Sequence, residues 1–529
     1  MPNIGQEVKR RRTFAIISHP DAGKTTITEK LILLGNLIQV AGSVKGKKAD
    51  KHATSDWMAM EQQRGISVTS SVMQFPYMDR VVNLLDTPGH EDFSEDTYRV
   101  LTAVDSALMI VDGAKGVEDR TIKLMEVCRL RDTPIFTFVN KLDRDIRDAI
   151  DVLDEIETVL KIKCAPINWP LGMGKEFKGV YNLYKDTIHV YRHGQGSQLH
   201  EVEVIEGIDS DEAKALLGSY RDDFRDEIEL VRGASNDFDL DAYLRGEMTP
   251  VYFGTALGNF GVKEMLDDFV EYAPAPQTRA TESRDVTATE SGFTGFVFKI
   301  QANMDPKHRD RLAFIKIVSG TFKRNAPYLH VRNGKKVKFS SPNTFFAEKK
   351  EIVDESFPGD IVGLHDTGNF KIGDTLTEGE HLNFKGIPSF SPEHFRYVNN
   401  ADPMKSKQLS KGLDQLMDEG VAQLFTLDMN GRKIIGTVGA LQYEVIQYRL
   451  EHEYGAKCSY ENIHVHKACW VEAEDTKNEE FKEFKRVKQR YLAKDKQGQL
   501  VFLADSSFTI QMTQSKYPTV KLHFTSEFQ

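Results

Sequence analysis

The sequence of 529 residues contains little cysteine and no long apolar run. Its cysteines form no CxxC pair and no spacing typical of zinc sites, so we expect reduced, buried thiols in a cytoplasmic protein. No stretch of about 18 apolar residues occurs, and the apolar segment behind the basic N-terminus is too short for a signal peptide, so we expect neither membrane insertion nor secretion. The cysteines are Cys128, Cys164, Cys458 and Cys469.

Basic residues are also fewer than acidic ones. Lysine and arginine number 69 against 79 aspartate and glutamate residues, a net charge of −10. This balance argues against a protein that coats nucleic acid through bulk charge, but it does not exclude local basic patches. The length predicts roughly three or four domains, and a hydrophobic content of 40 % excludes a mostly disordered chain.

Short apolar runs in the first half predict buried parallel strands. Each run lacks polar alternation and is followed by turn residues and a helical pattern, which is typical of a parallel sheet with helices on both faces. Such sheets bind ligands at the carboxyl ends of their strands, where the distinctive motifs of this chain occur. The predicted strands are 13–18, 81–86, 107–112, 134–140 and 250–254.

The first strand leads into a loop that resembles the phosphate-binding pattern GxxxxGK[ST], with Ser18 in place of the first glycine. Gly23 lets backbone N–H groups approach phosphate oxygens, and a helix starting near Lys24 adds free N–H groups and a positive dipole end. Lys24 supplies a cation for the β- and γ-phosphates, and the Thr25 hydroxyl suits Mg²⁺. A chance Gly-Lys-Thr turn is the alternative. The candidate residues of this loop are Ser18, His19, Pro20, Asp21, Ala22, Gly23, Lys24, Thr25 and Thr26.

The predicted strand at 81–86 ends in Asp-Thr-Pro-Gly-His. Asp86 is placed to hold Mg²⁺ through water, Gly89 can give its N–H to the γ-phosphate, and His90 can orient the attacking water as the candidate catalytic residue. An ordinary β-turn is the alternative, since every residue is a good turn former. The candidate residues of this motif are Asp86, Thr87, Pro88, Gly89 and His90.

The predicted strand at 134–140 ends in Asn-Lys-Leu-Asp, a motif that selects the base. Asp143 can accept N–H bonds from guanine N1 and N2, which adenine cannot donate together. Asn140 can contact N7 and a neighbouring loop, and the Lys141 stem can lie over the base. A solvated turn is the alternative for the motif alone. The candidate residues for the base are Asn140, Lys141, Leu142 and Asp143, with Thr255 and Ala256 after the last strand, where the Ala256 N–H can contact guanine O6.

The motifs, in this order, resemble those of the translational GTPases. The phosphate loop reads Asp-Ala-Gly-Lys-Thr-Thr at 21–26, and histidine stands at 90 where small signalling GTPases carry glutamine. Glu-Gln-Gln-Arg-Gly-Ile-Ser at 61–67 looks like the first switch, in which the family usually has a threonine that binds Mg²⁺. The resemblance implies GTP and GDP as ligands, with Thr25, Asp86 and either Ser67 or Thr69 as ligands to Mg²⁺.

The remaining segments predict further modules. We expect an inserted subdomain at about 163–248, strand-like at 179–192 and helical at 210–231, and a linker at 272–291. Strands at 293–300, 311–322, 328–339 and 360–365 predict a small β-barrel. An amphipathic helix at 409–417, strands at 422–427 and 433–438 and a helix at 439–450 predict an α/β sandwich. Basic segments at 307–311 and 481–490 are either RNA-facing or solvated.

The fold class is therefore multidomain α/β: a P-loop GTPase domain with a parallel-rich sheet, a β-barrel and a C-terminal α/β sandwich-like domain. We expect these domains at 1–278, 292–386 and 393–529. Nearly the whole chain resembles the bacterial release factor 3 branch of the family, on residues 18–26, 67, 86–96 and 293–311. Elongation factor G continues for two further domains, so a translocase is not expected.

This resemblance implies a ribosome-dependent GTPase of translation termination, in which GTP binding and hydrolysis promote dissociation of class I release factors from the ribosome after peptide release. The implied partners are the ribosome and those factors, without a membrane, and the expected state is a monomer. GTP is expected to rotate the later domains against the GTPase domain. A tetracycline-protection or translocation factor and a non-catalytic nucleotide-gated module are the alternatives.

Overall fold

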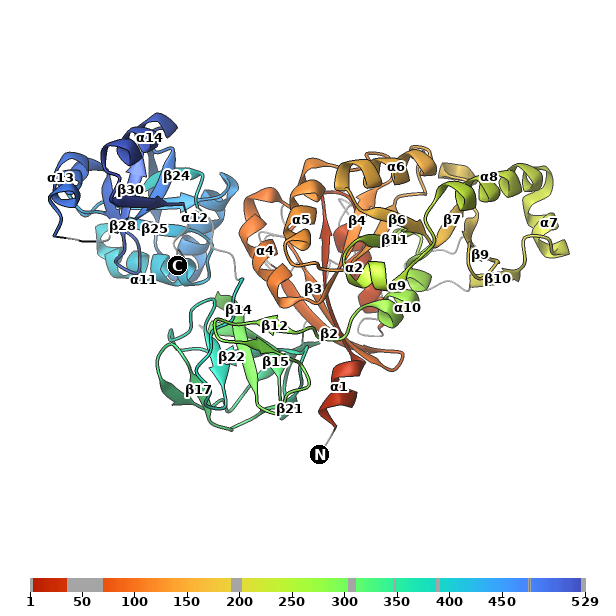
Figure 1. Cartoon of the computed structure of the whole chain (residues 1–529), viewed down its shortest axis with the longest axis horizontal. Coiled ribbons are helices and arrows are strands. Elements are labelled where there is room, and N and C mark those ends of the chain that lie inside the picture. Colours follow the sequence, from red (N-terminus) through yellow and green to blue (C-terminus); the bar gives the residue numbers. More distant parts are fainter. Residues whose placement is uncertain are drawn as a thin grey trace.

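The computed structural model describes residues 3–35, 70–191, 202–302, 311–346, 349–386, 391–473, 475 and 477–524. Figure 1 shows a central α/β domain with a curled β domain below it and a C-terminal domain to the left. An appendage projects from the central domain on the side away from the C-terminal domain. The multidomain α/β fold class is confirmed.

A mostly parallel sheet forms the middle of the central domain. Its strands lie side by side in the order β2 (Ser71–Tyr77), β3 (Arg80–Asp86), β1 (Arg11–Ser18), β4 (Ser106–Asp112), β5 (Ile135–Asn140), β11 (Met248–Phe253) and β6 (Lys163–Pro166). β2 is antiparallel to β3, and the other neighbours are parallel. The predicted strands are confirmed, and β2 and β6 extend the sheet.

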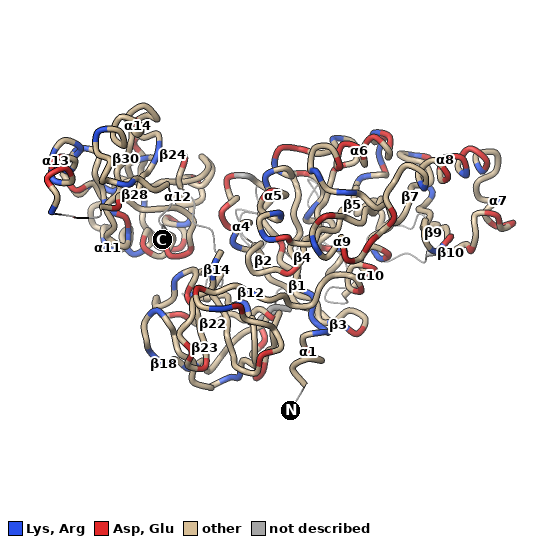
Figure 2. Tube along the Cα trace, in the orientation of Figure 1, with Lys and Arg blue, Asp and Glu red and all other residues tan. Residues whose placement is uncertain are grey.

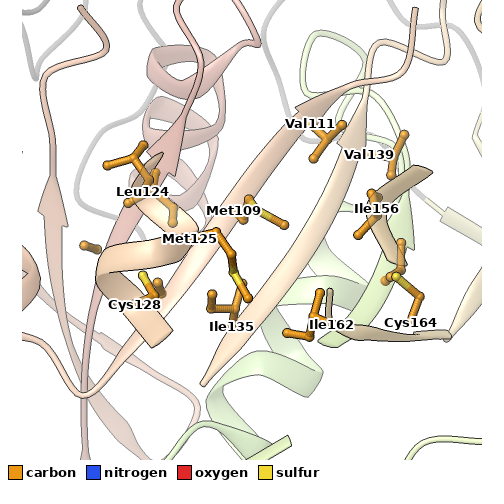
Figure 3. Close-up of a cluster of buried hydrophobic side chains, with 14 of the residues drawn as sticks. Met109, Val111, Leu124, Met125, Cys128, Ile135, Val139, Ile156, Ile162 and Cys164 are labelled. Carbon is orange, nitrogen blue, oxygen red and sulfur yellow. The ribbon is translucent and has the colours of Figure 1, made fainter. Parts of the chain in front are cut away.

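Helices cover both faces of this sheet, as its continuous apolar strands predict. They are α2 (Lys24–Leu34), α4 (Ser94–Ala103), α5 (Asp119–Arg129), α6 (Ala149–Leu160), α9 (Leu240–Leu244) and α10 (Val262–Tyr272). Helix α1 (Ile4–Arg10) precedes β1 and projects from the lower end of the domain (Figure 1). Apolar residues of α2 and α10 form one core with the sheet, and those of α4, α5 and α6 form another. Figure 3 shows part of the second core, where Met109 of β4 lies near Met125 of α5. None of the helices in the described ranges is long and apolar enough to cross a membrane.

The cysteine side chains are part of these cores. All four are buried and free of disulfides, which confirms the expectation of buried thiols. Burial raises the pKa of Cys128 to about 12 and that of Cys469 to about 12. Both thiols therefore stay protonated near neutral pH and serve as packing groups.

The appendage is formed between β6 and β11. Its antiparallel strands lie in the order β10 (Val202–Glu206), β9 (Thr187–Tyr191), β8 (Gly179–Asn182) and β7 (Asn168–Leu171), and its helices are α7 (Asp211–Leu217) and α8 (Arg221–Ala234). The strand-like segment predicted at 179–192 is two strands joined by a turn. The helical prediction at 210–231 is confirmed by α7 and α8.

The second domain is a curled antiparallel sheet. Its strands lie in the order β18 (Lys335–Val337), β17 (Tyr328–His330), β23 (Thr375–Thr377), β14 (Thr294–Ala302), β15 (Arg311–Ser319), β22 (Ile361–His365), β19 (Asn343–Phe346) and β20 (Lys349–Ile352), beside the pair β16 (Phe322–Lys323) and β21 (Glu355–Ser356). The strand predicted at 328–339 is divided into β17 and β18. The segment predicted as a linker at 272–291 contains a small β-ladder, β12 (Arg279–Ala280) with β13 (Asp285–Val286).

The C-terminal domain consists of two βαββαβ halves joined edge to edge. The first half is β24 (His394–Asn400), α11 (Ser406–Asp418), β25 (Gln423–Leu427), β26 (Lys433–Thr437), α12 (Leu441–Tyr454) and β27 (Cys458–Asn462). The second half is β28 (Lys467–Ala473), α13 (Glu479–Lys488), β29 (Leu492–Lys494), β30 (Leu500–Ala504), α14 (Ser507–Lys516) and β31 (Val520–His523). The strand order β27-β24-β26-β25-β29-β30-β28-β31 places the same ferredoxin-like arrangement on each side of the β25–β29 contact. The elements predicted between 409 and 450 are confirmed.

Buried charges attach the second domain to the amino ends of the central strands. Asp105, at the start of β4, pairs with Lys316 Nζ of β15 at 2.8 Å and with Arg279 of β12 at 3.1 Å. Arg11 of β1 pairs with Asp360 of the second domain at 2.8 Å. A buried ion pair adds little net stability, but removal of one partner leaves an uncompensated charge, so these pairs fix how the domains meet.

Asp105→Asn is expected to weaken this interface and change its response to acid. Burial alone would raise the pKa of Asp105, but the charges of Lys316 and Arg279 hold it below its ordinary value. The carboxylate therefore stabilises the fold above its unfolded pKa of about 3.9, and this contribution is lost as the pH falls through the folded pKa. At pH 7 we expect a loss of about 3–5 kcal/mol, because Lys316 stays buried without its partner.

The measurement is thermal unfolding of the full chain between pH 7 and pH 3. The unfolding temperature of the wild type should fall more steeply below pH 4 than that of Asp105→Asn. The control is Asp211→Asn, whose carboxylate is 94 % exposed, and it should follow the wild type. Parallel acid profiles for wild type and Asp105→Asn would contradict the assigned role.

Candidate functional site

The strand register brings the three sequence motifs to one edge of the central sheet. Ile16, near the end of β1, lies beside Asp86 at the end of β3, and Asp112 at the end of β4 lies beside Asn140 at the end of β5. Parallel strands end at the same edge, so the loops that follow them meet there. This edge is opposite to the one that carries Asp105.

The loop after β1 is shaped by Gly23. Its φ of 103° lies in the left-handed region, and a Cβ built on it would come within 2.2 Å of Asn140 Nδ2. Helix α2 begins at the next residue, so its free N–H groups face this loop. Lys24 is buried and its Nζ donates to Asp86 Oδ1 at 2.5 Å. The candidate phosphate-binding lysine and the candidate metal-binding aspartate are thus side by side.

Asn140 joins the candidate phosphate loop to the candidate base loop. Its Nδ2 donates to the carbonyl oxygen of Ala22 at 2.8 Å, and its Oδ1 accepts the N–H of Ala256 at 2.8 Å. A side-chain amide has two N–H donors, so one stays available for guanine N7. The contact predicted between the Ala256 N–H and guanine O6 would have to share this N–H with Asn140.

The rest of the base motif has an exposed carboxylate and an anchored lysine. Asp143 is exposed and its Oδ1 accepts a hydrogen bond from the Thr255 hydroxyl, which orients the carboxylate. Lys141, with a φ of 75°, donates to the Asp21 carbonyl at 2.5 Å and to Asp112 Oδ2 at 2.6 Å. Its stem therefore spans the gap between the phosphate loop and the strand ends.

Asp112 belongs to this site, although the sequence motifs do not include it. Burial alone would raise its pKa, but the hydrogen bond from Lys141 and those from the backbone N–H groups of Ala114 and Lys115 lower the pKa below its ordinary value. The carboxylate stays charged and holds Lys141 in place. Its position at the end of a predicted buried strand, like that of Asp86 and Asn140, is the signal that could have identified it.

The segment after β3 positions His90. The Thr87 hydroxyl donates to the Ile16 carbonyl at 2.6 Å, which fixes the segment just after β3 against β1. The backbone N–H of Asp92 donates to His90 Nδ1 at 3.2 Å, and the His90 side chain is 38 % exposed. When Nδ1 accepts this hydrogen bond, the neutral ring carries its proton on Nε2, whereas the Asp92 carboxylate, with Oδ1 3.5 Å from Nδ1, favours the other tautomer.

The polar groups at this edge fit a nucleotide phosphate. Within the part of the chain that the structure describes, Ser18 Oγ and His19 Nδ1 are buried without a hydrogen-bond partner, whereas buried polar atoms normally have one. Both lie in the loop whose N–H groups and lysine suit a polyanion. Thr25 and Asp86 are oxygen donors of the kind that Mg²⁺ prefers.

Some predicted residues cannot be placed or are placed elsewhere. Ser67 and Thr69, the alternative Mg²⁺ ligands, and residues 307–310 lie outside the described residues. Arg311, the end of the basic segment 307–311, is buried and paired with Asp366 at 2.7 Å and Asp418 at 2.9 Å. The prediction that it faces RNA is therefore wrong.

The comparisons with known proteins agree with this architecture. Residues 9–275 match the elongation factor Tu GTP binding domain, residues 292–379 match elongation factor G domain 2, and residues 384–514 match the C-terminal domain of class II release factor RF3. A crystal structure of a protein from Thermus thermophilus superposes with a TM-score of 0.70 at 21 % identity, covering 89 % of this chain and 71 % of that chain. At this identity, the likeness to the solved structure shows the fold alone.

The first of these matches covers more than half of the chain. The chain belongs to the translational GTPases, and its third region places it with the class II release factors of the RF3 type. It is a GTP-hydrolysing translation factor that binds guanine nucleotide and interacts with the ribosome.

Gly23→Ala is expected to lower nucleotide affinity by tenfold or more. The new Cβ would collide with Asn140 Nδ2 and force a side chain into a left-handed backbone region, so either the loop or Asn140 must move. Titration with a fluorescent GDP analogue measures the effect. Gly233→Ala, in helix α8 with nothing within 4 Å of the new Cβ, is the control and should bind as the wild type does. Equal affinities for Gly23→Ala and wild type would contradict the close packing of this loop on Asn140.

Proposed function

We propose that this chain is a ribosome-stimulated GTPase of translation termination, which promotes the dissociation of class I release factors from the ribosome after peptide release. The observation that carries the proposal is that a guanine-type base motif and a phosphate loop share one sheet edge in a chain whose third region matches class II release factor RF3. The partners proposed are the ribosome and class I factors, and the proposed state is a cytoplasmic monomer.

The nucleotide is proposed to bind along the edge from Ser18 to Asp143. Residues 18–26 surround the phosphates, with Lys24 moving from Asp86 to the β- and γ-phosphates. Asp143 accepts N–H bonds from guanine N1 and N2, while Thr255 keeps the carboxylate oriented. A Mg²⁺ ion held by Thr25, by Asp86 and by Ser67 or Thr69 would neutralise phosphate charge.

The proposed reaction is attack of water on the γ-phosphorus, which breaks its bond to the bridging oxygen and yields GDP and phosphate. His90 carries a proton on Nε2 when its Nδ1 accepts from the Asp92 N–H, so Nε2–H can hold the attacking water by its oxygen. Gly89 gives its N–H to the γ-phosphate. The His90 side chain is 38 % exposed, so a ribosomal surface can contact it directly, which supports stimulation by the ribosome.

Contact with ribosomal RNA is proposed for α13 and the residues that follow it. Phe481 and Phe484, which the sequence motif includes, pack inside the C-terminal domain. Lys485, Arg486 and Arg490, in the last turn of α13 and just after it, are exposed, whereas the first turn also exposes the acidic Glu479. The basic side chains can neutralise phosphates without reading a sequence.

Asp143→Asn is expected to change the preferred base from guanine to xanthine. An amide offers an N–H where the carboxylate offered an acceptor, and xanthine presents a carbonyl at C2 where guanine presents an amino group. Competition binding with GDP and xanthosine diphosphate should show a change in relative affinity of about 100-fold or more, about 2.7 kcal/mol. Retained guanine preference would contradict the assigned hydrogen bonds, and Asp145→Asn, an exposed neighbour, serves as the control.

His90→Ala is expected to abolish most of the ribosome-stimulated hydrolysis and to leave nucleotide binding intact. We expect a loss of about 10²–10³-fold in the single-turnover rate, the usual cost of removing a group that acts on the reacting atoms. The assay compares GTP hydrolysis without ribosomes, with ribosomes, and with ribosomes that carry a class I release factor, whose release is followed in parallel. Wild-type protein that shows no stimulation by ribosomes would favour a nucleotide-gated binding module instead.

A further inference from the structure

Three parts of the chain meet in one hydrogen-bonded cluster at Ser70, Asp96 and Lys299. Ser70 directly precedes β2, Asp96 lies in α4, and Lys299 lies in β14 of the second domain. The Ser70 N–H and hydroxyl both donate to Asp96 Oδ2, at 2.9 and 2.6 Å. Lys299 Nζ donates to the Ser70 carbonyl and to the Ser70 hydroxyl at 2.7 Å, and is 3.7 Å from Asp96 Oδ2.

The cluster is well satisfied and mostly buried. Ser70 is 2 % exposed and Lys299 is 4 % exposed. A buried ammonium group is costly unless it is paired and hydrogen-bonded, so Lys299 favours the arrangement in which Ser70 and Asp96 lie against it. Lys299 thus holds the start of β2 and helix α4 to the second domain at the same point.

The strand register and the chain order connect this cluster to the nucleotide edge. Ser71, the residue after Ser70, pairs with Asp86 in the β2–β3 register, and Asp96 is six residues after His90. The cluster therefore adjoins Asp86, a proposed Mg²⁺ ligand, and the segment that carries His90. GDP lacks the γ-phosphate, so fixing these residues should matter for GTP far more than for GDP.

We propose that Lys299 is a positioning residue for GTP: it fixes Ser70 against Asp96, and thereby the end of β3 at Asp86 and the segment that follows it, which meet Mg²⁺ and the γ-phosphate. This role rests on the proposed function of the edge from Ser18 to Asp143. It assigns to a residue of the second domain, outside the nucleotide-binding motifs, an influence on nucleotide preference.

Lys316 is a matched control within the same domain. It lies on β15, the strand that pairs with β14, and is buried like Lys299. It also pairs with an aspartate of the central domain, but that residue is Asp105 at the opposite end of the sheet. Loss of either lysine should weaken the same domain interface, whereas only the loss of Lys299 should change nucleotide preference.

The experiment uses the full chain with Lys299→Met, Lys299→Arg, Ser70→Ala and Lys316→Met. Fluorescence titration gives the dissociation constants for a non-hydrolysable GTP analogue and for GDP, and thermal unfolding reports folding. We expect Lys299→Met to weaken binding of the GTP analogue about tenfold relative to GDP. Ser70→Ala, which removes only a hydroxyl, should shift the ratio in the same direction by a smaller factor. Lys299→Arg should keep a ratio of the two dissociation constants close to that of the wild type. Lys316→Met should lower the unfolding temperature without changing this ratio.

An unchanged ratio in Lys299→Met, a ratio that shifts toward the GTP analogue, or equal shifts in Lys299→Met and Lys316→Met would each overturn this role. If Lys299→Met does not fold, Ser70→Ala decides, and an unchanged ratio in that variant overturns the role. Wild-type protein that binds neither nucleotide would overturn the proposed function as well. If the wild type binds normally and the Lys299→Met ratio is the same, only the role of Lys299 is overturned.

Discussion

The side-chain amide of Asn140 is the interaction on which the nucleotide edge depends. It gives an N–H to the phosphate loop at Ala22 and accepts an N–H from the base loop at Ala256. The amide is buried, so its two hydrogen bonds give partners to backbone groups that water cannot reach. Gly23 has no side chain because this amide occupies the space beside it. The two ends of the nucleotide site are therefore set by one residue and cannot shift independently.

The second domain attaches to both ends of the central sheet, and the C-terminal domain attaches near its nucleotide end. The second domain is held at the amino ends by buried charges at Asp105 and Arg11, while Lys299 reaches the nucleotide side through Ser70. The C-terminal domain contacts the segment after His90, where Asp92 accepts the N–H of Leu441 at 2.5 Å. A Cβ on Gly439 would lie 2.0 Å from the Asp92 carboxyl carbon, so the two chains touch closely. Movement at 90–92 would therefore displace the C-terminal domain directly. Rotation of the second domain would first have to break its buried ion pairs with the central domain.

Continuous apolar strands made the central sheet predictable, since buried parallel strands leave this pattern and place their polar ends together. Asp112 was not predictable as a site residue from the sequence motifs, because a single aspartate at the end of a strand, without a surrounding motif, does not indicate a function. The basic neighbours of Arg311 predict an exposed side chain, but its partner Asp418 is 107 residues away in the sequence. The two-residue strands β12 and β13 are too short for any periodicity, and the two βαββαβ halves are evident only from strand order. The domain limits at 278, 292, 386 and 393 stay predictions.

The acidic balance of the chain has a local origin. Residues 202–241 contain 13 acidic and 4 basic side chains, a net charge of −9, so the remaining sequence is close to neutral at −1. Figure 2 shows acidic residues along α7 and α8, at the opposite end of the molecule from α13. Charges are screened within about 8 Å at physiological ionic strength, a length smaller than a single domain. The net charge of −10 therefore cannot weaken a contact between α13 and RNA, and the affinity of that contact depends on its own lysines and arginines.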